Sequence, residues 1–120
     1  MASGLQFILT FLLIAVESTI PDNMNKKLIS VEFEVFGRVQ GVFFRKYTQQ
    51  ESKKLGLRGW CRNTERGTVL GVMEGEESKI NNMKNWLQYN GSPSSKIDKA
   101  EFKNVKDLSE FTFSNFSIKR

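Results

Sequence analysis

The sequence predicts one α+β domain of the ferredoxin-like class, a βαββαβ sandwich whose antiparallel sheet carries two helices on one face. Three observations lead to this prediction. Some short segments alternate apolar and polar residues, which is typical of half-buried strands, and two others have helical spacing. These segments follow in the order strand, helix, strand, strand, helix, strand. A chain of 120 residues also has room for one domain with a core and little more.

The first half of the domain begins with a predicted strand in which Val31, Phe33 and Val35 alternate with two glutamates. A glycine ends this alternation, and residues 37–41 are predicted to form a loop. Residues 44–55 then have helical spacing, and the glycine that follows is a natural stop for a helix.

The second half begins with two predicted strands, residues 57–64 and 68–74. The turn between them contains Gly67, which tolerates the positive φ of a hairpin turn. Apolar residues at helical spacing between positions 80 and 87 predict a second helix. Two extended segments are expected to complete the sheet, around residues 97–105 and 111–118.

The composition excludes several kinds of chemistry. The chain has no histidine, so imidazole catalysis and His-ligated metal sites are excluded. Its one cysteine, Cys61, cannot form an internal disulfide or a thiolate cluster, and we interpret it as a small strand residue. No metal and no cofactor are therefore predicted. The formal net charge of +5 favours anionic partners without choosing among them.

The N-terminal residues have a different character from the rest of the chain. Residues 1–22 are interpreted as an apolar extension outside the domain, which spans residues 23–120. The apolar run at 5–16 is shorter than a membrane span and has the length of a signal-peptide core, yet no Lys or Arg precedes it. A secreted or membrane-associated form therefore stays open. The single free cysteine favours the cytoplasm, which is the predicted location.

The first candidate motif is the loop at residues 37–45, which leads into the first helix. Glycines at both ends of a short turn let backbone N–H groups converge on an anion, and the start of a helix adds further N–H groups. Arg45, in the first turn, can grip the same anion with two N–H groups. The glycines alone favour the simpler interpretation, a strand-to-helix turn with a solvated arginine.

The second candidate motif, residues 59–67, ends the second predicted strand. Asn63 stands just before the hairpin turn, where asparagine is most often a turn residue.

The strings GRVQGVFFR (residues 37–45) and GWCRNTERGTV (residues 59–69) resemble, in this order, the two signature blocks of the acylphosphatase family, of the common or muscle type. The resemblance continues through residues 91–95 and 115–118. It implies an enzyme in which Arg45 binds the phosphoryl group and Asn63 positions the attacking water. The same resemblance implies a phosphate-binding loop made of Arg38, Val39, Gln40, Gly41 and Val42. Two features depart from the family pattern: Cys61 replaces the more frequent valine, and the chain ends in Lys-Arg where an aromatic residue is common.

The implied reaction needs few catalytic groups. The substrate would be a small acyl phosphate and the products a carboxylate and inorganic phosphate. A carboxylate leaves without a general acid because the pKa of its conjugate acid is near 4. A neutral asparagine cannot take a full proton, so we infer that the proton of the water ends on a phosphoryl oxygen. We expect a monomer, with no nucleic acid partner and no membrane contact by the domain itself.

The alternative is a non-catalytic module of the same fold that binds anions or RNA. RNA-binding domains of this architecture expose aromatic residues on the sheet within a characteristic string, which this sequence lacks.

Overall fold

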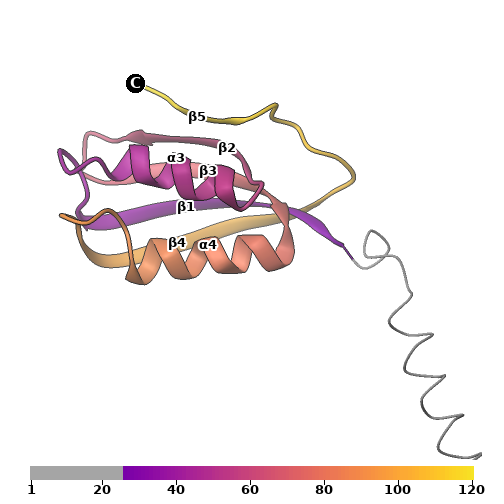
Figure 1. Ribbon diagram of the computed structural model, residues 1–120, viewed down its shortest axis with the longest axis horizontal. Helices are drawn as coiled ribbons and strands as arrows, with labels where there is room; N and C mark the ends of the chain where they lie inside the picture. The colour runs from indigo at the N-terminus through magenta and orange to yellow at the C-terminus, as the bar shows by residue number, and fades with distance from the viewer. Residues whose placement is uncertain (1–25) are drawn as a thin grey trace, which may run out of the picture.

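The computed structural model describes residues 26–120, which form a five-stranded sheet and two helices (Figure 1). The predicted N-terminal extension, residues 1–22, lies outside the described residues. In chain order the elements are β1 (Leu28–Arg38), α3 (Phe44–Lys54), β2 (Arg58–Asn63), β3 (Val69–Glu76), α4 (Glu77–Tyr89), β4 (Lys96–Leu108) and β5 (Phe116–Ile118).

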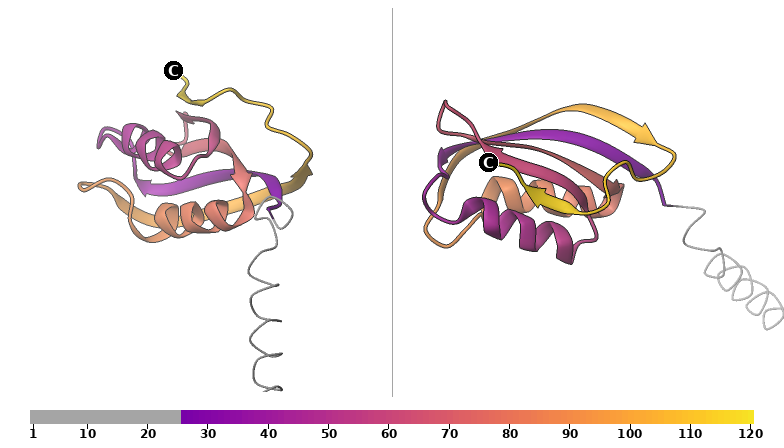
Figure 2. Two further views of the ribbon diagram at one scale, coloured as in Figure 1. Left: turned by 45° about the vertical axis from the view of Figure 1, so that its right-hand side comes forward. Right: turned by 90° about the horizontal axis from the view of Figure 1, so that it is seen from above.

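The sheet has the strand order β4-β1-β3-β2-β5. The first four strands pair antiparallel, and β5 lies parallel to β2 at one edge. Both helices cover the same face, as the view from above shows (Figure 2). The predicted sandwich is confirmed, with a mixed sheet because its last strand is parallel.

Alternation along β1 places the core between the sheet and the helices. Ile29, Val31, Phe33 and Val35 are buried, whereas the residues between them are only partly covered. Helix α4 contributes its apolar stripe to the same core. The buried apolar residues are Ile29, Val31, Phe33, Val35, Val39, Phe44, Leu57, Cys61, Val69, Met73, Ile80, Met83, Leu87 and Phe116.

The first strand is longer than its sequence pattern indicates, because β1 continues through Gly37 to Arg38. Its pairing with β4 shifts register between Phe36 and Gly37. Gly37 has a φ of 127°, and a Cβ atom there would overlap the carbonyl oxygen of Lys96. The glycine predicted to end the strand therefore lets β1 stay paired through an irregularity.

The last extended segment is shorter than predicted, since only Phe116–Ile118 of residues 111–118 pairs as a strand. The backbone N–H groups of Thr112 and Phe113 donate to the Glu74 carboxylate at 2.7 Å each, and so does the Thr112 hydroxyl. Glu74 itself is only 1% exposed. This carboxylate replaces a neighbouring strand as the hydrogen-bond acceptor, so the segment crosses the end of the sheet as a loop.

Between residues 26 and 120, no helix is long and apolar enough to cross a membrane.

Candidate active site

A pocket of about 540 Å³ lies beside the loop that joins β1 to α3. The loop and the chain end after β5 lie at the same end of the sheet (Figure 1). Segments far apart in the sequence therefore share one cavity. Its lining residues are Val39, Gly41, Phe43, Phe44, Arg45, Lys46, Gln49, Asn63, Ile118 and Arg120.

The loop has the backbone geometry of an anion-binding concavity. Positive φ angles occur at Gly41 (71°) and Phe43 (59°) but not at Val42 between them. Alternation of this kind turns successive N–H groups toward a common point, as in the nests that bind phosphate. Glycine adopts such an angle freely at position 41.

The start of α3 adds donors to the same concavity. The first intrahelical bond of α3 runs from the Tyr47 N–H to the Phe43 carbonyl, so the three preceding N–H groups have no partner within the helix. No side chain caps this end, and its first turn contains no acidic residue. Arg45 and Lys46 instead place positive charge at the positive end of the helix dipole, which is unfavourable without an anion. These features together favour a bound anion here.

Asn63 reaches the pocket from the end of β2. Its backbone pairs with Val69 across the β2–β3 hairpin, which fixes its position. Its side-chain Oδ1 is buried and has no hydrogen-bond partner among residues 26–120. A buried acceptor without a partner is uncommon, because leaving it unpaired costs free energy. The Asn63 amide therefore has a free acceptor for a water molecule in the pocket.

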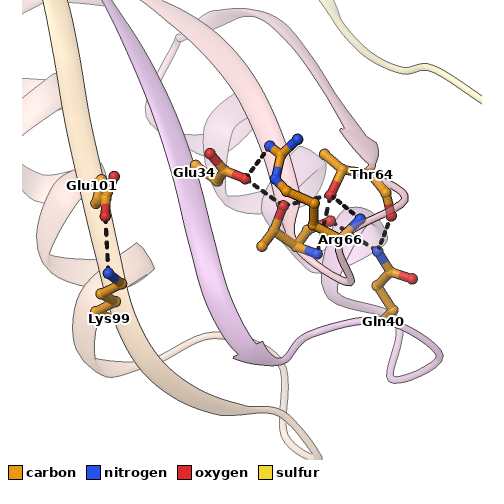
Figure 3. Close-up of polar contacts among 7 residues, drawn as sticks. Glu34, Gln40, Thr64, Arg66, Lys99 and Glu101 are labelled. Atoms are coloured by element: carbon orange, nitrogen blue, oxygen red, sulfur yellow. Dashed lines mark hydrogen bonds and ion pairs between the residues drawn. The ribbon is translucent and has the colours of Figure 1, made fainter.

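A polar network joins the loop to the hairpin that carries Asn63 (Figure 3). Gln40 Nε2 donates to the carbonyl oxygens of Thr64 and Thr68, at 2.9 Å each. The hydroxyls of Thr64 and Thr68 are 2.6 Å apart, and the Thr68 hydroxyl donates to Glu34 Oε2 at 2.6 Å. Arg66 also pairs with Glu34 at 2.6 Å. The network therefore fixes the position of the β1–α3 loop relative to the β2–β3 hairpin, which carries Asn63.

Glu34 is the carboxylate on which that network ends. The hydrogen bond from Thr68, the hydrogen bond from Arg66 and the charge of Arg66 lower the pKa of the Glu34 carboxyl below its ordinary value of 4.5, although partial burial opposes them. The ionised form is thus the one that the fold stabilises.

Cys61, one of the residues at which the sequence departs from the family pattern, is a buried residue of β2. Burial raises the pKa of its thiol to about 12, and the positive charge of Arg45 opposes this only partly. The thiol therefore stays protonated at neutral pH and is a poor nucleophile. Its Sγ lies 3.9 Å from the Arg45 carbonyl oxygen, as expected of a packing residue.

The far wall of the pocket comes from β5 and the residues after it. Gln49 Nε2 donates to the Phe116 carbonyl at 3.0 Å, which fastens β5 to α3. The ladder with β2 then continues through the Lys119 N–H, which donates to the Cys61 carbonyl at 2.8 Å. In this way Ile118 and Arg120 reach the cavity.

Four of the residues singled out in the sequence line the pocket: Val39, Gly41, Arg45 and Asn63. The other three do not. Arg38 is an exposed residue at the end of β1, Val42 is partly buried against the core, and the Gln40 side chain turns to the hairpin.

The other six lining residues were not named as site residues in the sequence analysis. Gln49 is four positions after Arg45, so helical spacing alone would have placed both on one face. Phe43 and Phe44 lie within the loop motif and Lys46 directly follows it, so their place in the sequence could have marked them. No local signal marks Ile118 and Arg120, because the pairing of β5 with β2 brings them to the pocket.

The described part of the chain contains no cluster of three or more cysteine, aspartate or glutamate side chains that could hold a metal ion.

Fold and pocket together define a small ferredoxin-like sandwich with an anion-binding loop between its first strand and first helix. Comparison with known families matches residues 31–118 to Acylphosphatase. The chain is 56% identical over 96 residues to acylphosphatase-2 of Rattus norvegicus, covering 80% of this chain and 99% of the relative. It is 57% identical over 91 residues to acylphosphatase-1 of Homo sapiens, covering 76% and 92% respectively.

Solved structures agree with the sequence relatives. The acylphosphatase from Bacillus subtilis superposes with a TM-score of 0.67 at 33% identity, over 77% of this chain and 99% of that one. The acylphosphatase from Coxiella burnetii has the same TM-score at 29% identity, over 78% and 94%. This chain belongs to the acylphosphatase family.

Proposed function

We propose that this chain carries out the reaction of its family, hydrolysis of the carboxyl–phosphate bond of an acyl phosphate, in the pocket between the β1–α3 loop and Asn63. Family membership makes the chain an enzyme of the hydrolase class. The substrate is a small acyl phosphate, and the products are a carboxylate and inorganic phosphate. Which residues perform the steps is our proposal.

Arg45 and the backbone bind the phosphoryl group. The N–H groups of the loop and of the first turn of α3 meet some of its oxygens, and the Arg45 guanidinium meets the others with two parallel hydrogen bonds. In the transition state for phosphoryl transfer, charge is spread over these oxygens. Donors that are already oriented toward that charge stabilise it without reorganising.

Asn63 positions the nucleophile. Its Oδ1 accepts a hydrogen bond from water, which attacks phosphorus while the bond from phosphorus to the carboxylate oxygen breaks. The leaving group takes the bonding electrons and departs as a carboxylate. The proton of the water passes to a phosphoryl oxygen, because a neutral amide cannot hold it. Every atom is thereby accounted for without a protein acid or base.

The observation that carries this proposal is the free acceptor of Asn63. Its Oδ1 is buried without a partner in the described chain, and Asn63 lines the same pocket as Arg45. If Asn63 were only a turn residue, we would expect its side chain to bond with the turn backbone. The hydroxyl of the neighbouring Thr64 does so instead, accepting from the N–H groups of Arg66 and Thr68 at 3.2 Å each.

Substitution of Arg45 tests the site by separating charge from geometry. Arg45→Gln removes the cation and should lower kcat/KM for acetyl phosphate by about 10²–10³-fold or more. Arg45→Lys keeps the charge but loses the planar fork, so we expect it to recover little of that activity. Arg62→Gln is the matched control, since Arg62 is an exposed arginine next to Asn63 that does not line the pocket.

Circular dichroism on all four proteins provides the folding control. Near-normal turnover by folded Arg45→Gln would refute the assignment of this site. A loss of similar size in Arg62→Gln would show that general positive potential, and not the pocket arginine, drives the reaction.

We also propose that the domain works without nucleic acid, as a monomer and in the cytoplasm. On the open face of the sheet, the rings of Phe36 and Trp60 are each covered by a lysine Nζ, at 4.6 and 4.3 Å from the ring centre. Glu34 and Glu101 are neighbours on the same face, where they pair with Arg66 and Lys99, so these two basic side chains already have acidic partners (Figure 3). Stacking on RNA bases needs free rings, so this face suits RNA poorly.

These three proposals have separate tests. Filter retention of RNA that weakens with rising salt would refute the first, and a concentration-dependent mass in sedimentation would refute the second. The sequence contains two Asn-x-Ser tripeptides of the kind that accept N-linked glycans, beginning at Asn90 and Asn115. Glycans at either one on native protein would refute a cytoplasmic location.

A further inference from the structure

Phe43 is an unusual residue at its position. It has a φ of 59°, in the left-handed region that a bulky side chain rarely adopts. Its side chain is also not used by the fold, because the residue is 72% exposed. The positive φ serves the anion-binding loop, and a glycine would provide it without strain. The aromatic ring therefore adds nothing that the backbone or the core requires.

The position of the ring suggests its use. Phe43 lines the pocket together with partly buried Ile118, which comes from β5. Polar groups line the same pocket through Arg45 and Asn63. An acyl phosphate also has two unlike ends, a phosphoryl group and an acyl group. When the polar groups hold the phosphoryl end, the acyl end is left to the apolar residues at the mouth.

We propose that Phe43 is a specificity residue, whose ring contacts the acyl group and favours apolar, above all aromatic, acyl phosphates over acetyl phosphate. The inference rests on the proposed function, since it names the residue that contacts the acyl group of the same substrate. An aromatic acyl group can pack face or edge against the Phe43 ring, whereas an acetyl group offers a single methyl. The strain at position 43 is then retained because the ring is needed at the pocket mouth.

The test compares kcat/KM for benzoyl phosphate with kcat/KM for acetyl phosphate. In Phe43→Ala we expect the benzoyl-to-acetyl ratio to fall about 5- to 10-fold, chiefly through KM for benzoyl phosphate, which is the size expected for one lost aromatic contact. Phe43→Leu should give an intermediate ratio. Tyr89→Ala is the matched control, because Tyr89 is 78% exposed and lies outside the pocket, and it should keep the wild-type ratio.

Phe43→Gly tests whether a change in the benzoyl-to-acetyl ratio could instead result from loss of folding. It relieves the positive φ, so it should unfold at no lower temperature than wild type while still losing the preference for benzoyl phosphate. An unchanged ratio in the Ala and Gly variants, with both substrates hydrolysed, would overturn the role of Phe43 and leave the proposed function standing. If wild-type protein hydrolysed neither substrate, the proposed function would fail, and this inference with it.

Discussion

The side-chain oxygen of Asn63 has no hydrogen-bond partner in the described chain. Substitution can separate the proposed role of Asn63 in positioning water from the role of the anion-binding loop in binding phosphate. Asn63→Ala removes the water-positioning group but none of the loop N–H groups. We expect turnover of acetyl phosphate to fall about 10²–10³-fold, while inhibition by inorganic phosphate stays close to wild type. Steady-state kinetics with phosphate as inhibitor measures both. Asn82→Ala, at an exposed position on α4, is the matched control.

The opposite result would reassign the residue. If phosphate inhibition were lost together with turnover in folded Asn63→Ala, Asn63 would belong to the anion-binding loop, and another group would have to position the water.

Glu34 makes stability depend on pH in a predictable direction. Its pKa is lowered in the folded state, so its contribution is complete above the ordinary value of 4.5 and is lost as the pH falls through the lower, folded value. Glu34→Gln removes that contribution. Urea midpoints should therefore show wild type more stable than Glu34→Gln at pH 7, with the difference shrinking below pH 4.5. A difference that grew on acidification would contradict the lowered pKa.

Among the elements, the loop between β4 and β5 depends most on a single side chain. Glu74→Ala removes a buried carboxylate and leaves two N–H groups and one hydroxyl of the loop without their acceptor. We expect a loss of about 2–4 kcal/mol in the free energy of unfolding, measured by urea denaturation. Glu110→Ala, at an exposed position in the same loop, should change stability by less than about 0.5 kcal/mol.

That substitution also tests how the loop affects the pocket. The loop leads directly into β5, so Glu74→Ala should raise KM in protein that is still folded. Equal stability of Glu74→Ala and wild type would mean that the Glu74 contacts contribute nothing net.

The elements that sequence reasoning predicted well are those whose pattern is local. Alternation at Val31, Phe33 and Val35 reports burial of one face directly, and α4 shows its apolar stripe in the same way. The loop and Arg45 are likewise contiguous in sequence, so a motif can represent them.

The features that sequence reasoning did not predict depend on contacts between residues far apart in the sequence. Residues 111–115 were predicted as part of a strand, but the N–H groups of Thr112 and Phe113 donate to the Glu74 carboxylate, 38 positions before Thr112. Gln40 belongs to the loop motif, yet its side chain serves the hairpin 24 and 28 positions later. Asn63 and Ile118 line the same pocket because β5 pairs with β2, which no local pattern encodes.

At the scale of the whole molecule, the family match begins at residue 31, after the apolar N-terminal segment. We therefore expect a chain lacking residues 1–22 to fold and to keep the kcat/KM of the full chain within about twofold, because each element that lines the pocket is retained. Circular dichroism and acetyl phosphate kinetics on both chains measure this. A truncated chain that failed to fold would place the apolar segment in the core.

Because β5 is short and is the last element in the chain, circular dichroism and catalytic activity are expected to report on different steps of refolding. Because β4 and β5 occupy opposite edges of the sheet, the chain must cross from one edge to the other before the pocket has its second wall. A molecule with β5 detached would retain four antiparallel strands and both helices. During refolding, far-ultraviolet circular dichroism therefore reports mainly on the rest of the sandwich, whereas catalytic activity reports on the docking of three residues that follow every other element in chain order.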